Sequence, residues 1–103
     1  MVDITETARE SGLTPRTLLS QGAWQVFSKR GQIQGRDLGK RLSGMLDTLH
    51  IALTQRKGPK EKMIHFSTPL EDRGNMANKV ILIATVEASA CGNSVITIML
   101  PGE

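Results

Sequence analysis

Few side chains in this 103-residue sequence can act as acids, bases, nucleophiles or zinc ligands near neutral pH. The histidines are His50 and His65, and Cys91 is the single cysteine. No two of these three share the short spacing that zinc ligands usually have, and Cys91 falls in a predicted turn with no base beside it in sequence. The segment GRDLGKR at 35–41 lacks the spacing of a phosphate loop and the hydroxyl residue after its lysine. We therefore predict no catalytic residue, no metal and no cofactor.

His65 is the one histidine for which we keep a catalytic alternative. It lies in the alternating segment KMIHFSTPL at 62–70, where it shares a face with Ser67. Helices followed by an antiparallel meander also describe small ribonuclease toxins, whose sheets carry basic residues for acid–base attack at phosphate. Arg73 and Lys79 are the nearest cations in the adjacent loop and strand. A meander-type ribonuclease toxin is therefore one alternative function.

The stretch ETARESGLTPRTLL at 6–19 has the residue spacing of a helix-turn-helix. The matching positions are Ala8, Gly12, Leu13 and Leu18. In such a motif the second helix would expose Arg16 and Thr17, whose side chains can contact phosphates and base edges. Helix capping explains the same residues, because Gly12 can close one helix and Thr14 can begin the next. A helix-turn-helix DNA-binding protein is therefore a second alternative.

Two groups of segments resemble known proteins. GLTPRTL at 12–18 resembles the equivalent segment of MerR-type regulators, which implies DNA binding through a helix-turn-helix. Ala8, ESGLTP at 10–15 and Leu18–Leu19, together with ITIMLPGE at 96–103, are similar to short uncharacterised proteins of bacterial plasmids, phages and other mobile elements. The second resemblance implies an accessory protein of a bacterial mobile genetic element and assigns it no activity.

We expect three helices in the first half of the chain, over 4–10, 15–29 and 36–55. The first follows a capping-box pattern, and Thr14 before Pro15 is a favourable start for the second. The third has the clearest helical period, because its apolar residues fall on one stripe. The stripe contains Leu38, Leu42, Met45, Leu46, Leu49, Ala52 and Leu53.

Beyond residue 60 the pattern changes to the two-residue period of strands. The segment 62–70 alternates, 79–89 is apolar on both faces, and 94–101 follows a turn. We therefore predict an α+β fold in which two or three N-terminal helices pack on a C-terminal three-stranded antiparallel β-meander. At this length the chain can build one core, so we expect residues 1–103 to form a single domain.

The net charge is +3, and the basic residues concentrate in one part of the chain. Between residues 35 and 62 there are seven Lys and Arg residues against three Asp and Glu residues. With Arg16 and Thr17, these seven are our candidate contacts to nucleic acid or another anionic partner. They are Arg36, Lys40, Arg41, Arg56, Lys57, Lys60 and Lys62.

The composition excludes several classes of function. Trp24, Phe27 and Phe66 are the only aromatic residues, which argues against binding that stacks bases on aromatic side chains. One cysteine cannot form an intramolecular disulfide, and no apolar run reaches membrane-spanning length. We expect a cytoplasmic protein without a membrane partner. Our first hypothesis is a small non-enzymatic binding protein that acts through a protein or a nucleic acid. The sequence does not fix its oligomeric state, and a homodimer is one of the options.

Overall fold

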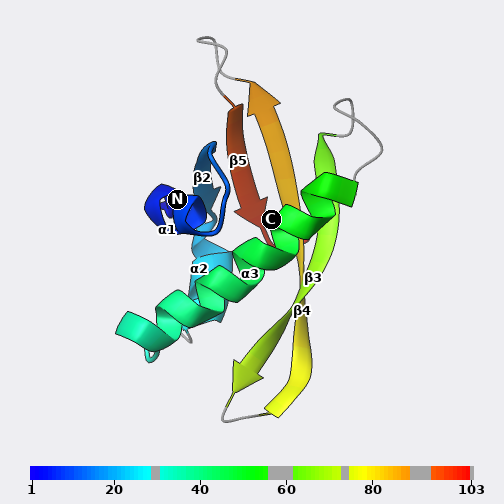
Figure 1. The fold of residues 1–103 in the computed structure, drawn as a ribbon. Coiled ribbons are helices and arrows are strands. Elements are labelled where there is room, and N and C mark those ends of the chain that lie inside the picture. The colour runs from blue at the N-terminus through cyan, green and yellow to red at the C-terminus, as the bar shows by residue number, and fades with distance from the viewer. Residues whose placement is uncertain (29–30, 56–61, 73–74, 89–93, 103) are drawn as a thin grey trace.

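The computed structural model describes residues 1–28, 31–55, 62–72, 75–88 and 94–102, which form an α+β fold (Figure 1). In chain order its elements are β1 (Val2–Asp3), α1 (Thr5–Glu10), β2 (Arg16–Leu19), α2 (Gln21–Ser28), α3 (Gly35–Gln55), β3 (Met63–Asp72), β4 (Asn75–Ala88) and β5 (Ser94–Met99). The predicted α+β class is confirmed, whereas the sheet of the described residues has five strands in place of the predicted three. Some residues named above lie outside the described part of the chain: Arg56, Lys57, Lys60, Arg73 and Cys91.

The strands form one mixed sheet in the order β1-β2-β5-β4-β3. Strands β3, β4 and β5 make the predicted antiparallel meander, with Met63 opposite Thr85 and Ile83 opposite Met99. Strand β2 pairs with the other edge of β5 in parallel, and β1 pairs with β2 antiparallel. The meander is thus one part of a larger sheet, whose edge strands are β1 and β3.

The predicted helix over 15–29 is wrong in its first part, because Arg16–Leu19 is the strand β2. Thr17 and Leu19 are fully buried and lie beside Ile96 and Ile98 of β5. Burial in a sheet outweighs the capping pattern, since local helix propensity is only a weak preference. We had expected all helices to precede the strands. Instead β1 precedes α1, and β2 lies between α1 and α2 in the chain.

Ser20 is the N-cap of the helix α2, which begins at Gln21, six residues after the predicted start. Its hydroxyl oxygen accepts the amide of Ala23 at 3.2 Å, and its carbonyl accepts the amide of Trp24 at 2.9 Å. This is an N-cap arrangement, which satisfies an otherwise unpaired amide in the first turn. The amide of Ser20 also donates to the carbonyl of Ile98 at 2.8 Å. The start of α2 is therefore held against β5.

The turn after α1 closes as its glycine predicts. Gly12 has a φ of +91°, a left-handed conformation that favours glycine. Its amide donates to the carbonyl of Arg9 at 3.0 Å, and the amide of Leu13 donates to the carbonyl of Ala8 at 2.9 Å. These two bonds form a Schellman motif, with Ala8 and Leu13 both buried. The motif directs the chain from α1 toward β2.

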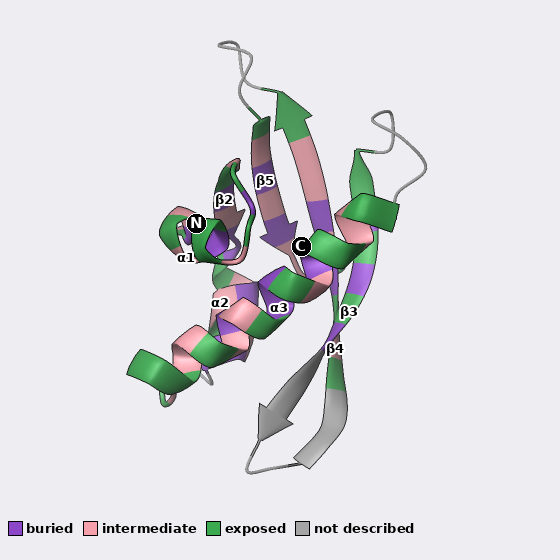
Figure 2. Cartoon of the chain, viewed as in Figure 1, coloured by how far each residue is buried: buried purple, intermediate pink, exposed green. Residues whose placement is uncertain are grey.

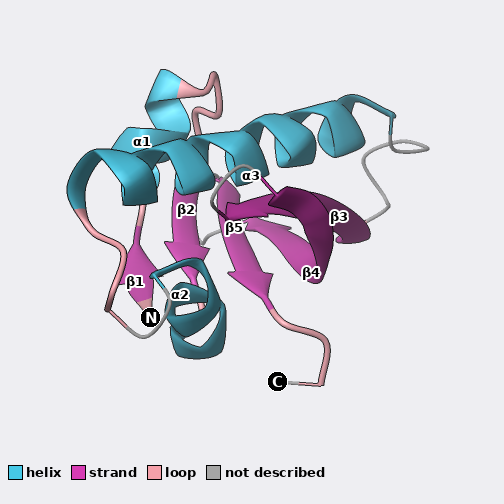
Figure 3. Cartoon of the chain, turned by 90° about the horizontal axis from the view of Figure 1, so that it is seen from below, coloured by secondary structure: helices cyan, strands magenta, loops and turns pink. Residues whose placement is uncertain are grey.

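Helix α3 lies across one side of the sheet (Figure 3) and supplies the centre of the core. The predicted stripe is confirmed: Leu42, Met45, Leu46 and Leu49 are buried, and the other three residues are partly buried against the same cluster. Buried residues, purple in Figure 2, concentrate where α3 crosses β5, β4 and β3. Among the described residues, no helix combines the length and apolar character needed to cross a membrane.

Candidate functional site

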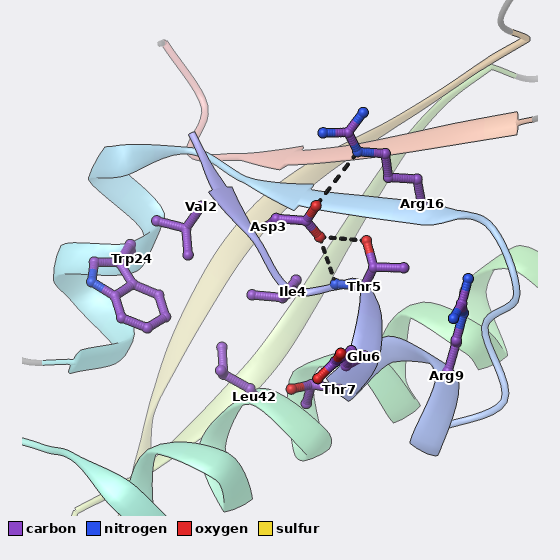
Figure 4. A pocket seen from close by; sticks show the side chains of 10 residues that line it. All are labelled: Val2, Asp3, Ile4, Thr5, Glu6, Thr7, Arg9, Arg16, Trp24 and Leu42. Carbon is purple, nitrogen blue, oxygen red and sulfur yellow. Dashed lines mark hydrogen bonds and ion pairs between the residues drawn. The ribbon is translucent and has the colours of Figure 1, made fainter.

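A pocket of about 670 Å³ lies at the β1 edge of the sheet, where β1 turns into α1 (Figure 4). Residues from β1, α1, β2, α2 and α3 line it. These elements converge because β2 places β1 at the edge of the sheet while α1 and α2 flank the same pair of strands. The pocket therefore exists only in the folded chain.

One end of the pocket is apolar. Val2, Ile4, Trp24 and Leu42 line this end, and Figure 4 shows their side chains around a common space. Ile4 and Leu42 are buried in the core, whereas Val2 and Trp24 are partly buried against it. The wall is therefore fixed by packing, and it still presents apolar surface to a ligand.

The other end is polar and is organised by Asp3. One carboxylate oxygen of Asp3 accepts the amide of Thr5 at 2.9 Å and also the hydroxyl of Thr5. The second oxygen lies 3.5 Å from Nε of Arg16. The hydroxyl oxygen of Thr5 in turn accepts the amide of Thr17 at 3.1 Å. This network joins β1, α1 and β2 and holds Arg16 at the rim.

The hydrogen bonds from Thr5 lower the pKa of Asp3 below its ordinary value, the side-chain bond having the largest effect. The amide of Thr5 and the guanidinium of Arg16 act in the same direction. Because the side chains of Asp3 and Arg16 are 51% and 63% exposed, water screens their attraction, and the ion pair itself contributes little stability. Its role in the pocket is to orient Arg16.

Charges of both signs surround the polar end. Asp3 and Glu6 oppose Arg9 and Arg16, so the four formal charges of the lining balance. Such a rim does not attract a polyanion through net charge. It can instead position hydrogen-bonding groups around an uncharged or locally dipolar ligand.

Of the two candidate contacts in the opening stretch, the structure brings only Arg16 to the pocket. Arg16 is exposed on β2 and lines the rim. Thr17 is fully buried, and its hydroxyl donates to the carbonyl of Pro15 at 3.1 Å. Residues 6–19 form helix, turn and strand, so the second helix that a helix-turn-helix requires is not present there.

The described residues of the basic segment do not form one compact patch. Arg36 and Lys40 are exposed in the first two turns of α3, whereas Lys62 is exposed just before β3. The remainder of α3 separates its first two turns from Lys62 in the chain, and the whole helix is roughly 30 Å long at about 1.5 Å per residue. Arg41 is half-buried, and its guanidinium donates to the carbonyl of Phe27 at 3.3 Å, which links α3 to α2.

His65 lies on the sheet face opposite α3, far from the pocket. It is exposed and stands opposite Ile83, with Ser67 two residues further along β3. Lys79 stands opposite Pro69, and Pro69 is four residues from His65 along β3. At about 3.3 Å per residue this places Lys79 roughly 13 Å along the sheet from His65. Across the residues that the structure describes, no group of three His, Cys, Asp or Glu side chains could hold a metal ion.

The sequence did not single out the residues of the apolar end as a site. Trp24 counted only as one of three aromatic residues, and Leu42 only as part of the helical stripe. Comparison of the chain with protein-family models, curated proteins and solved structures finds no match. The case for a function therefore depends on the geometry of the pocket and of the exposed sheet face.

Proposed function

We propose that this protein is a non-catalytic binding protein, and that its pocket receives an apolar side chain from a protein partner. The observation that carries the proposal is the apolar end formed by Val2, Ile4, Trp24 and Leu42 beside a hydrogen-bonded polar rim. Pockets that bind ligands combine apolar walls with a few placed polar groups, over about 300–1,000 Å³. An accessory role also agrees with the resemblance of the chain's ends to mobile-element proteins.

A protein partner fits this pocket better than a nucleic acid does. The lining has balanced charge, whereas phosphate contacts need an excess of Lys and Arg. Trp24 is the one aromatic side chain in the lining, so bases have no series of rings on which to stack. A tryptophan within an apolar pocket is instead typical of the residues that dominate protein interfaces.

Cross-linking from the pocket tests this proposal directly. A photoreactive benzoylphenylalanine replaces Glu6, which is exposed at the rim of the pocket, or Thr54, which is exposed at the end of α3 and takes no part in the lining. We expect a discrete adduct with a second protein in cells from Glu6 and no such adduct from Thr54. Mass spectrometry then identifies the partner, which is purified for the second step.

The second step measures binding through Trp24, the only tryptophan in the chain. Titration with the purified partner should shift Trp24 emission. Thr7→Phe fills the pocket and should weaken binding roughly tenfold or more, about 1.4 kcal/mol, whereas the matched Thr54→Phe should not change affinity. Equal affinity in both variants, or adducts with nucleic acid alone, would contradict the proposal.

A further inference from the structure

A second feature, independent of the pocket, is the outer edge of β3. Among the described residues, β4 is the only strand that pairs with β3. The amide of Val86 donates to the carbonyl of Lys62 at 2.8 Å, which makes these two residues a hydrogen-bonded pair. In an antiparallel ladder such pairs alternate with pairs whose main-chain groups point away. Met63, His65 and Ser67 therefore direct their N–H and C=O groups toward the open edge.

Pro69 ends this set of donors. Pro69 is the next residue of β3, after Ser67, whose main chain faces the open edge, and proline has no N–H to donate. The open edge is thus confined to 63–68, MIHFST, which contains no Asp, Glu, Lys or Arg. Proteins commonly protect edge strands with such charges or with proline. Here Pro69 stands at one end and the exposed Lys62 at the other, and the six residues between them can accept another strand.

Side chains beside this edge also lack a covering. Met63 is 54% exposed and Ile81 is 58% exposed, both on the sheet face opposite α3. Ile81 stands opposite Ser67, whose small side chain leaves it open on that side. Ile51, which is 58% exposed, lies in the last two turns of α3, and Figures 1 and 3 show this end of the helix reaching β3.

We propose that the β3 edge pairs with the β3 edge of a second copy of this chain, antiparallel and centred on His65. In this register His65 lies opposite His65 of the second copy, and Met63 lies opposite Ser67 of the second copy. All three outward residues of each chain then exchange main-chain bonds, about six in total. A register shifted by two residues would put Met63 opposite His65, or opposite Pro69, which has no N–H to donate to the Met63 carbonyl.

Charge and side-chain packing favour a second copy as the occupant. The stretch has no Asp, Glu, Lys or Arg that would repel its copy, and a two-fold axis makes one surface complementary to an identical one. The register also brings Met63 of one copy beside Ser67 of the other, next to the exposed Ile81. The two sheets become one continuous sheet with α3 of both copies on the same side, and two open edges are removed together.

The test measures mass in solution and the protection of individual amides. Analytical ultracentrifugation over a concentration series up to millimolar should show a species of twice 11.2 kDa. Hydrogen exchange followed by NMR should show that the amides of Met63, His65 and Ser67 become protected as concentration rises. The alternate amides of Ile64 and Phe66 bond β4 and should be protected at every concentration.

A matched pair of variants locates the interface. His65→Asp places two carboxylates opposite each other across the two-fold axis and should weaken dimerisation roughly tenfold or more. Thr85→Asp adds the same charge on the same face one strand inward, and dimerisation should persist. Circular dichroism and Trp24 emission check that both variants fold.

Three outcomes would overturn the proposal. The first is a monomer at all concentrations with rapid exchange at Met63, His65 and Ser67. The second is a dimer that tolerates His65→Asp and leaves these amides unprotected, which would place the interface elsewhere. The third is a monomer whose three amides become protected only when a different protein is added, which would assign the edge to that protein.

Discussion

At the scale of single residues, Thr5 does more than its position in α1 suggests. Its hydroxyl donates to Asp3 and accepts the amide of Thr17, so one side chain completes the ends of both β1 and β2. The amide of Ile4 donates to the carbonyl of Thr17 at 3.0 Å, and the chain then turns into α1. The Thr5 hydroxyl oxygen therefore accepts the Thr17 amide in place of a main-chain carbonyl of a neighbouring strand.

Thr5→Val should therefore raise the pKa of Asp3 toward its ordinary value. A carboxyl with a lowered folded-state pKa adds stability above its unfolded-state pKa, and this stability is lost as pH falls through the folded-state pKa. The variant should thus lose more stability at neutral pH than in acid. It should also lose a part that does not depend on pH, because the Thr17 amide is left unpaired.

An NMR titration of the Asp3 carboxyl carbon, with thermal unfolding at several pH values, measures both effects. Thr54→Val is the matched control, since the Thr54 hydroxyl donates to a main-chain group, the carbonyl of Ile51. An unchanged pKa of Asp3 in Thr5→Val would show that the hydroxyl bond is not the main cause of the shift.

At the scale of elements, α3 is the member on which the others pack. Its buried stripe belongs to the cluster that includes β3 of the meander, and the helix also contacts α1 and α2. Arg41 adds a polar link by donating to the carbonyl of Phe27. One helix thus joins the pocket end of the molecule to the β3 edge.

Leu46→Ala should destabilise the protein by about 2–5 kcal/mol, because Leu46 is fully buried and its removal leaves a cavity. Urea unfolding at equilibrium measures the difference. Asp47→Ala is the control, since Asp47 is exposed on the opposite side of the same helix and its loss should change stability by about 0.5 kcal/mol or less. Similar midpoints for wild type and Leu46→Ala would contradict the packing of the stripe.

At the scale of the whole molecule, the N-terminal segment and the meander share one core. A single buried cluster includes residues of α1, β2, α2, α3 and all three meander strands, among them Leu19, Phe27, Leu46, Phe66 and Ile98. The parallel pairing of β2 with β5 joins the two segments through backbone bonds as well. Neither segment can therefore lose its structure without exposing the other.

Unfolding should accordingly be a single cooperative transition. Trp24 emission reports on α2 beside the pocket, whereas far-ultraviolet circular dichroism reports on all helices and strands. We expect urea curves from the two probes to coincide, as they do for two-state proteins. Fluorescence that changes at lower urea than the circular dichroism would show that the pocket region unfolds separately.

The sequence by itself determined the features that depend on local periodicity. The α3 stripe, the alternation along β3 and the end of the first helix at Gly12 were each predicted from spacing or from one residue type. Such patterns are reliable because the faces of a helix or strand repeat at fixed intervals, and each apolar face must be buried. The α+β class followed from the same patterns.

Only the tertiary structure decided the role of residues 16–19 and the position of the pocket. TPRTLL satisfies the local rules for a helix start, yet pairing with β5 makes 16–19 a strand, since Thr17 and Leu19 are buried there beside Ile96 and Ile98. The partner strand lies more than 75 residues away in the chain, so no local pattern can report it. The pocket has the same cause: Val2, Trp24 and Leu42 become neighbours only after β1 and β2 join the sheet, because long-range burial rather than local preference sets that arrangement.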